Sequence, residues 1–151
     1  MSSNLYSDRP AIHACDNDFE TYAETSEATA ETSEATAEQG TITIDYGRDN
    51  FEFISTSVVL MNKESLWDAE LGWALYMEGC LPIVLDSSGS FVGSCEALSP
   101  VNTDINTIAS QTYSLSCHGF KGRYIQWISA TGTNRRALIV ETWAIVEFEG
   151  N

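Results

Sequence analysis

Hydrophobic and polar residues alternate along much of the chain after Gly40 with a period of two. The alternation is clearest in residues 41–46 and 112–117, and residues 123–128 are rich in aromatic and β-branched side chains. Strands with one buried face show this period because successive side chains point to opposite faces. Further strands are expected at residues 51–54, 57–61, 73–77, 82–85, 137–140 and 142–148.

Turn-forming residues separate these segments, as at residues 47–50, 86–90 and 131–134. The only segment with a helical pattern is 66–75, and Gly72 lowers the helix propensity there. Many short strands with turn signals at intervals of roughly ten residues are typical of a β-sandwich or barrel. The sequence therefore predicts an all-β fold.

A perfect repeat precedes this pattern: residues 24–30 and 31–37 have the same sequence, ETSEATA. No large apolar residue occurs in it, which excludes a coiled coil. We interpret residues 24–38 as an acidic surface loop, because long loops cost little additional closure entropy. The alternative is that this loop contacts a neighbouring molecule or carries O-linked glycan.

Composition limits both the size and the partners of the protein. Its 151 residues, 43% of them apolar, suit one domain with a packed core. No apolar stretch is long enough to insert into a membrane. The net charge of −15, from 22 acidic and seven basic residues, argues against nucleic acid as a partner because phosphates would be repelled.

The cysteines and the N-terminus bear on location. Four cysteines without C-x-x-C spacing argue against a zinc ribbon and are compatible with two disulfides. The first residues have neither the basic start nor the apolar region of a signal peptide. Either a leader has been removed or the chain begins inside a cell; we favour a location outside the cell or at its surface.

Several motifs, in order, resemble those of discoidin (coagulation-factor type C) domains, and of their fucolectin branch in particular. They are Asn4-Leu5 with Pro10-Ala11, A-C-D-N-D at 14–18, T-I-D-Y-G at 43–47, V-V-L-M-N at 58–62, G-R-Y-I at 122–125 and L-I-V-E-T-W-A at 138–144. The resemblance implies one jelly-roll β-sandwich of about eight antiparallel strands over residues 1–151, with ligand loops at one end. It also implies a local structural pairing for Arg123.

The same resemblance implies a disulfide between Cys95 and Cys117. The family's cysteine near the C-terminus is replaced here by Val140. Cys15 and Cys80 then pair with each other, stay free or bridge to another chain.

A calcium site is the second implication. By the family's pattern, Asp16 and Glu141 supply carboxylates, and His13, Asp18 and Val140 supply backbone carbonyls. A Ser or Thr completes the set, with Thr25 and Ser26 as candidates. Ca²⁺ prefers hard oxygen ligands of this kind. The alternative is that the two acids are ordinary members of an acid-rich surface.

The sugar site departs from the family. Fucose-binding relatives use one His and two Arg; here Lys63 replaces one Arg and the second position falls near Asp68. No His follows the expected calcium loop, so fucose binding itself is in doubt. Four residues remain candidates for holding another glycan: Lys63, Trp67, Asp68 and Tyr22. Trp67 is equally consistent with a half-buried residue at a strand end.

No catalytic motif is present, and His13 and His118 are remote from any nucleophile motif. We therefore expect a non-enzymatic protein. One interpretation is a calcium-braced, lectin-like module that binds a glycan or a protein ligand. The alternative is a structural subunit whose partners are copies of itself, assembled into an extracellular filament, sheath or shell; the missing binding arginines favour it.

Overall fold

The computed structural model describes residues 23–24, 40–61, 76–101, 110–131 and 136–148. Within these ranges the chain forms β-strands joined by turns, and no helix long and apolar enough to cross a membrane occurs among them. The strands are β1 (Ala23–Glu24), β2 (Thr41–Asp45), β3 (Phe51–Met61), β4 (Leu81–Leu85), β5 (Phe91–Ser94), β6 (Ser110–Gly122), β7 (Tyr124–Ile128), β8 (Leu138–Ile139) and β9 (Glu141–Phe148).

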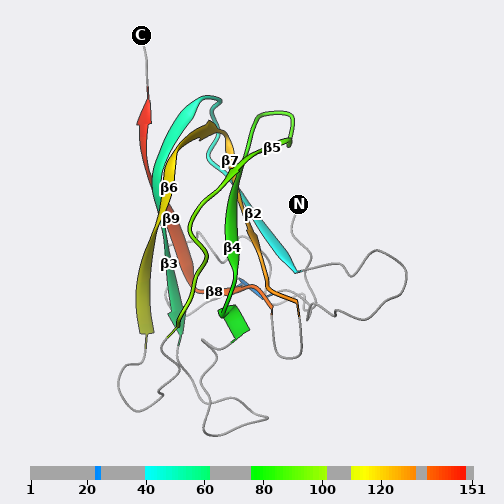
Figure 1. Ribbon diagram of the computed structural model, residues 1–151, viewed down its shortest axis with the longest axis vertical. Helices are drawn as coiled ribbons and strands as arrows, with labels where there is room; N and C mark the ends of the chain where they lie inside the picture. The colour runs from blue at the N-terminus through cyan, green and yellow to red at the C-terminus, as the bar shows by residue number, and fades with distance from the viewer. Residues whose placement is uncertain (1–22, 25–39, 62–75, 102–109, 132–135, 149–151) are drawn as a thin grey trace, which may run out of the picture.

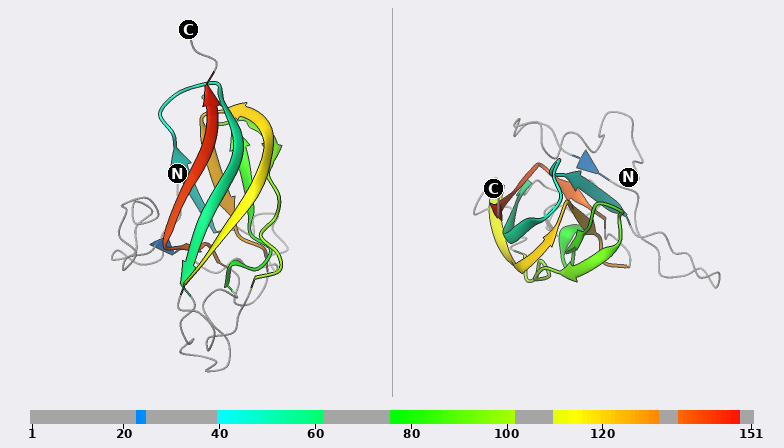
Figure 2. Two further views of the ribbon diagram at one scale, coloured as in Figure 1. Left: turned by 90° about the vertical axis from the view of Figure 1, so that its left-hand side faces the viewer. Right: turned by 90° about the horizontal axis from the view of Figure 1, so that it is seen from above.

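Two antiparallel sheets make up the body of the protein (Figure 1). One has the strand order β2-β7-β4-β5 and the other β6-β3-β9, while the short β1 pairs with β8. Seen from above, the two sheets curve around a common interior (Figure 2). The all-β sandwich expected from the sequence is confirmed.

The core lies between the sheets. Trp127, Phe53 and Ile42 are completely buried, and each lies on an inward-facing position of its strand. In β7, burial alternates along the strand because Ile125 and Trp127 point inward. This is the alternation that the sequence showed.

One expected break in the sheet does not exist. The sequence predicted separate strands at 51–54 and 57–61, but β3 runs without interruption through both, with a register shift between Phe53 and Ser55. Thr56 is fully buried in the middle of β3, and its hydroxyl donates a hydrogen bond to the carbonyl of Trp143. A buried polar residue is tolerated where it is hydrogen-bonded, so the polar Ser-Thr-Ser segment continues the strand.

Other boundaries also differ. Tyr76 and Met77, predicted at the end of a strand, form a 3₁₀ turn, whereas residues 73–75 and the possible helix at 66–75 lie outside the described residues. β5 was not predicted, because its four residues include Gly93 and are too few to show a period. Of the acidic repeat, only Glu24 is described, and it belongs to β1 rather than to a loop.

The disulfide between Cys95 and Cys117 is confirmed. It joins the segment after β5 to β6 and thereby links the two sheets at their β5 and β6 edges. Cys80 is a free thiol, and its complete burial raises its pKa. Cys15 lies outside the described residues.

Arg123 makes the local structural pairing that the resemblance implied. Its Nε and Nη2 donate to the two carboxylate oxygens of Asp45, at 2.9 and 3.1 Å. These bonds, together with one from the Gly47 amide, lower the pKa of Asp45. Two of the motifs behind the family resemblance thus meet in one ion pair between neighbouring strands.

Candidate ligand-binding end

Several strands begin or end together at the lower end of the sandwich in Figure 1. β3 and β7 end there, and β4, β6 and β9 begin there. We call this part of the molecule the loop end, because residues 62–75, 102–109 and 132–135 connect elements that meet there.

A turn at residues 76–80 organises the loop end. The Gly79 amide donates to the Leu98 carbonyl and the Leu98 amide donates to the Cys80 carbonyl, both at 2.8 Å. Gly79 has a φ of +81°, and a β-carbon there would lie 3.2 Å from that of Ala130. Only glycine fits this turn without strain.

Glu78 holds the neighbouring segment from the same turn. One carboxylate oxygen accepts a hydrogen bond from the Ser99 hydroxyl, and the other accepts one from the Val101 amide at 2.8 Å. Residues 99–101 are thereby fixed at the point where the chain enters residues 102–109.

Arg136 is attached to the turn from the other side. Its amide donates to the Tyr76 carbonyl at 3.0 Å, and its guanidinium carbon lies 4.8 Å from the centre of the Tyr76 ring. The Leu138 amide lies 3.2 Å from the Met77 sulfur. The sequence provided no sign of these contacts because the partners are about sixty residues apart in the chain. Together with the Glu78 contacts, these contacts fix one end of each connecting segment: residue 76 follows 62–75, residue 101 precedes 102–109 and residue 136 follows 132–135.

Glu141, the predicted calcium ligand, is the first residue of β9 and is only 6% exposed. The Val140 amide donates to the Val59 carbonyl at 3.0 Å, which fixes the backbone beside it. A buried carboxylate is costly unless polar partners or a cation compensate its charge, so this position suits a metal ligand. The other predicted ligands, Asp16, His13 and Asp18, lie outside the described residues, as do Thr25 and Ser26.

Within the described ranges no three His, Cys, Asp or Glu side chains come together as a metal cluster. A complete calcium site would therefore need ligands from residues beyond these ranges. Calcium binding stays a prediction.

The four predicted glycan-binding residues, Lys63, Trp67, Asp68 and Tyr22, also lie outside the described residues. Their neighbours in sequence are described, however. Lys63 follows the end of β3 by two residues, and Tyr22 directly precedes β1, which pairs with β8 just before Val140. The anchors of these segments thus lie at the same end of the sandwich as Glu141.

No family model matches the sequence, and no curated protein matches it. Solved structures do resemble it. A Streptococcus pneumoniae fucose-binding module, SpX-3, aligns with a TM-score of 0.65 at 11% sequence identity, covering 98% of this chain and 93% of that one. A chitosan-binding module from a Paenibacillus chitosanase/glucanase aligns at 0.62 and 13% identity, covering 97% and 90%.

A fucolectin from striped bass serum aligns at 0.64 and 16% identity, covering 97% of this chain and 45% of that one. At such low identities the similarity concerns the fold and not the ligand. The chain has the discoidin-type, galactose-binding-like jelly-roll fold that these carbohydrate-binding modules share.

Proposed function

We propose that this chain is a non-enzymatic, lectin-like module that binds a glycan or glycoprotein at its loop end. One observation carries the proposal. The described residues that flank the segments bearing Lys63, Trp67 and Tyr22 lie at one end of the sandwich, beside the buried Glu141. The turn at residues 76–80 braces that end against deformation. The known proteins with this fold include modules named for binding fucose and chitosan.

The residue types suit a sugar. Aromatic rings such as those of Trp67 and Tyr22 cover the apolar face of a pyranose, while Lys63 and Asp68 donate to and accept from its hydroxyl groups. The arginines and histidine of fucose binders are missing, so the preferred ligand is a glycan other than fucose.

Calcium belongs to this proposal as a brace. Asp16 and Glu141 would supply carboxylate ligands, and the carbonyls of His13, Asp18 and Val140 would supply neutral oxygens. The buried position of Glu141 fits such an ion. The ion would tie the N-terminal segment to β9, close to the ligand loops.

The disulfide supports a location outside the cell or at its surface. Structural disulfides persist in oxidising compartments and are rare in the cytosol. Cys95 and Cys117 are almost completely buried and form such a bridge.

A glycan array is the test, run with calcium and again with chelator. We expect Trp67→Ala and Lys63→Ala to abolish or strongly weaken the main array signal, and chelator to reduce it. Phe91→Ala is the control, because Phe91 is an exposed aromatic residue in β5, away from the loop end. If the main signal survives Trp67→Ala, or is lost equally in Phe91→Ala, the loop end is not the binding site.

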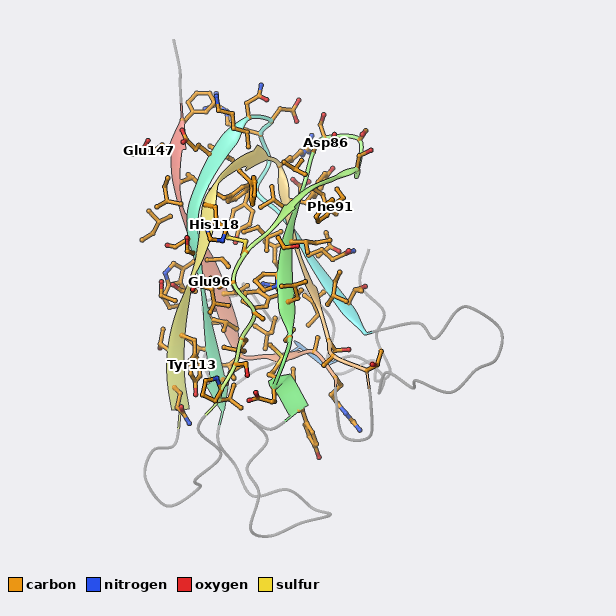
Figure 3. The ribbon with its side chains drawn as sticks, viewed as in Figure 1. Asp86, Phe91, Glu96, Tyr113, His118 and Glu147 are labelled. Atoms are coloured by element: carbon orange, nitrogen blue, oxygen red, sulfur yellow. A yellow bond between two sulfur atoms is a disulfide. The ribbon has the colours of Figure 1, made fainter. Side chains whose placement is uncertain are left out.

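The second candidate function is a self-assembling structural subunit, and β5 favours it. β5 is the last strand of its sheet, and Phe91 on it is 62% exposed. Figure 3 labels this residue beside β5. Exposed apolar edge strands pair readily with other chains. Light scattering and electron microscopy would detect polymers, and Phe91→Lys should dissolve them. Monomers at high salt, where the repulsion between acidic copies is screened, would argue against assembly.

A further inference from the structure

The outer face of the β6-β3-β9 sheet carries an unusual set of side chains. Its cross-strand register aligns Trp143 with Ser57 and Ser114, and Ile145 with Ser55 and Ser116. Trp143 is 41% exposed and Ile145 is 56% exposed, both on the edge strand β9. We call these six residues the serine face: two apolar side chains along one edge, with serines on the two neighbouring strands. Ser114 is exposed, Ser55 and Ser116 are partly exposed, and Ser57 is buried.

A backbone irregularity borders the serine face. Between paired positions of β3 and β6, residues 117–119 of β6 lie opposite the single residue Ile54. At this bulge His118 adopts a φ of +57°, a left-handed conformation that is unfavourable for a residue with a side chain. Such strain is concentrated at functional positions, and here it leaves His118 exposed beside the serine face.

The disulfide brings a carboxylate to the same border. Because Cys95 bonds to Cys117, the residues that follow them, Glu96 and His118, lie close together on the β6 side (Figure 3). Oε1 of Glu96 accepts a hydrogen bond from the Ser116 amide at 2.6 Å, and the His118 amide donates to the Ser116 hydroxyl at 3.3 Å. The side chains of Glu96 and Ser116 are thus held in place by the protein itself, which lowers the entropic cost of binding.

Charge on this face is mainly negative. Glu52 and Glu147 are directly opposite each other on β3 and β9, with Lys121 next to Glu52 on β6, and Glu96 lies at the border. Two carboxylates opposite each other in a sheet repel, and Lys121 offsets part of their charge. Three carboxylates against one lysine still leave this face negative, which favours a positively charged ligand.

The serines of the serine face favour one kind of ligand over another. Serine is depleted in the cores of protein–protein interfaces, whereas hydroxyl groups beside an exposed indole suit a sugar chain. β9 and β6 are two strand spacings apart, about 10 Å, a distance that a short oligosaccharide spans.

We propose that the serine face is a second binding surface, separate from the loop end, for a positively charged amino-sugar glycan. One sugar lies over Trp143, where its ammonium group also gains from the electron-rich ring. The oligosaccharide passes over the accessible serines, Ser55, Ser114 and Ser116, and further ammonium groups contact Glu96 and the Glu52–Glu147 pair.

The test is calorimetric titration with a glucosamine oligomer, using the N-acetylglucosamine oligomer of equal length as the neutral counterpart. We expect the cationic oligomer to bind and the neutral one to bind much more weakly. Trp143→Ala should weaken binding about three- to fivefold. Glu96→Gln should weaken it about threefold, while its amide oxygen still accepts the Ser116 hydrogen bond and so preserves the fold.

Asp86→Asn is the charge-matched control, because Asp86 lies in the β4–β5 turn, on the other side of the molecule in Figure 3, and asparagine suits the same turn position. It should leave the affinity unchanged. Equal losses in Asp86→Asn and Glu96→Gln would mean general charge attraction and overturn the proposal. Binding that is lost in Trp67→Ala but retained in Trp143→Ala would overturn it as well, while supporting the loop end as the binding site.

Discussion

Removing the Cys95–Cys117 disulfide should cost a large share of the stability of this domain. The perturbation is the double variant Cys95→Ala/Cys117→Ala. The two cysteines are 22 positions apart in sequence. The chain-entropy relation for a loop of that length gives about 3.4 kcal/mol of destabilisation at 25 °C. Stabilities of whole domains are about 5–15 kcal/mol, so the variant should still fold, but with a much smaller margin.

Urea denaturation followed by tryptophan fluorescence is the assay. The predicted loss lowers the unfolding midpoint by roughly 1 to 3 M. The wild-type protein measured in a reducing agent is the internal comparison, and it should unfold close to the double variant. Cys80→Ala controls for the loss of a buried sulfur outside the disulfide.

A midpoint shift equivalent to less than about 1 kcal/mol would refute the reasoning. It would mean that the contacts around the bridge already restrict this loop in the unfolded ensemble. The Cys95 amide donates to the Pro82 carbonyl and the Glu96 amide to the Ser116 carbonyl, so the native segment has anchors besides the disulfide. Those anchors exist only in the folded state, which is why we expect the full entropic effect.

Three further predictions concern the ion pair, one glycine and the calcium site. The hydrogen bonds from Arg123 lower the pKa of Asp45 below its ordinary value of 3.8, so Asp45→Asn should destabilise the protein above pH 3.8. The difference in stability from the wild type should vanish as the pH falls through the lowered pKa, and thermal melts across this range would check it. Gly122→Ala should destabilise by about 1–3 kcal/mol in urea titrations, because its β-carbon would lie 2.5 Å from the Leu85 carbonyl oxygen; an unchanged midpoint would contradict the packing. Calcium should raise the melting temperature of the wild type but not that of Glu141→Gln, and an equal rise in both would remove Glu141 from the site.

Much of the sandwich was predictable because strand periodicity is a local property. The alternation in residues 41–46 and 123–128 marks β2 and β7, and their inward positions are those that are buried. Prediction was wrong where a tertiary partner changed the meaning of a polar residue. Thr56 suggested a break between two strands, yet its hydrogen bond to the Trp143 carbonyl allows it to be buried inside one continuous strand.

The site was less predictable than the fold. The order of the motifs was enough to predict the Cys95–Cys117 pair and the role of Arg123, because both follow from a shared topology. The proposed ligand residues lie outside the described ranges, and Lys63 stands in place of the family's arginine, so the resemblance no longer identifies the sugar. The contact of Arg136 with Tyr76 had no local signal at all.

The sequence by itself determined that the chain forms a β-sandwich and which positions of its periodic strands face the core, because period and composition are properties of the chain alone. Only the tertiary structure decided which strands are neighbours, where β6 bulges and which side chains lie together. Glu96 and His118 are 22 residues apart, and nothing in the pattern places them side by side; the disulfide before them and the register of β3 with β6 do so. Register and bulges are set by contacts between distant segments, and those contacts exist only when the whole sheet has formed.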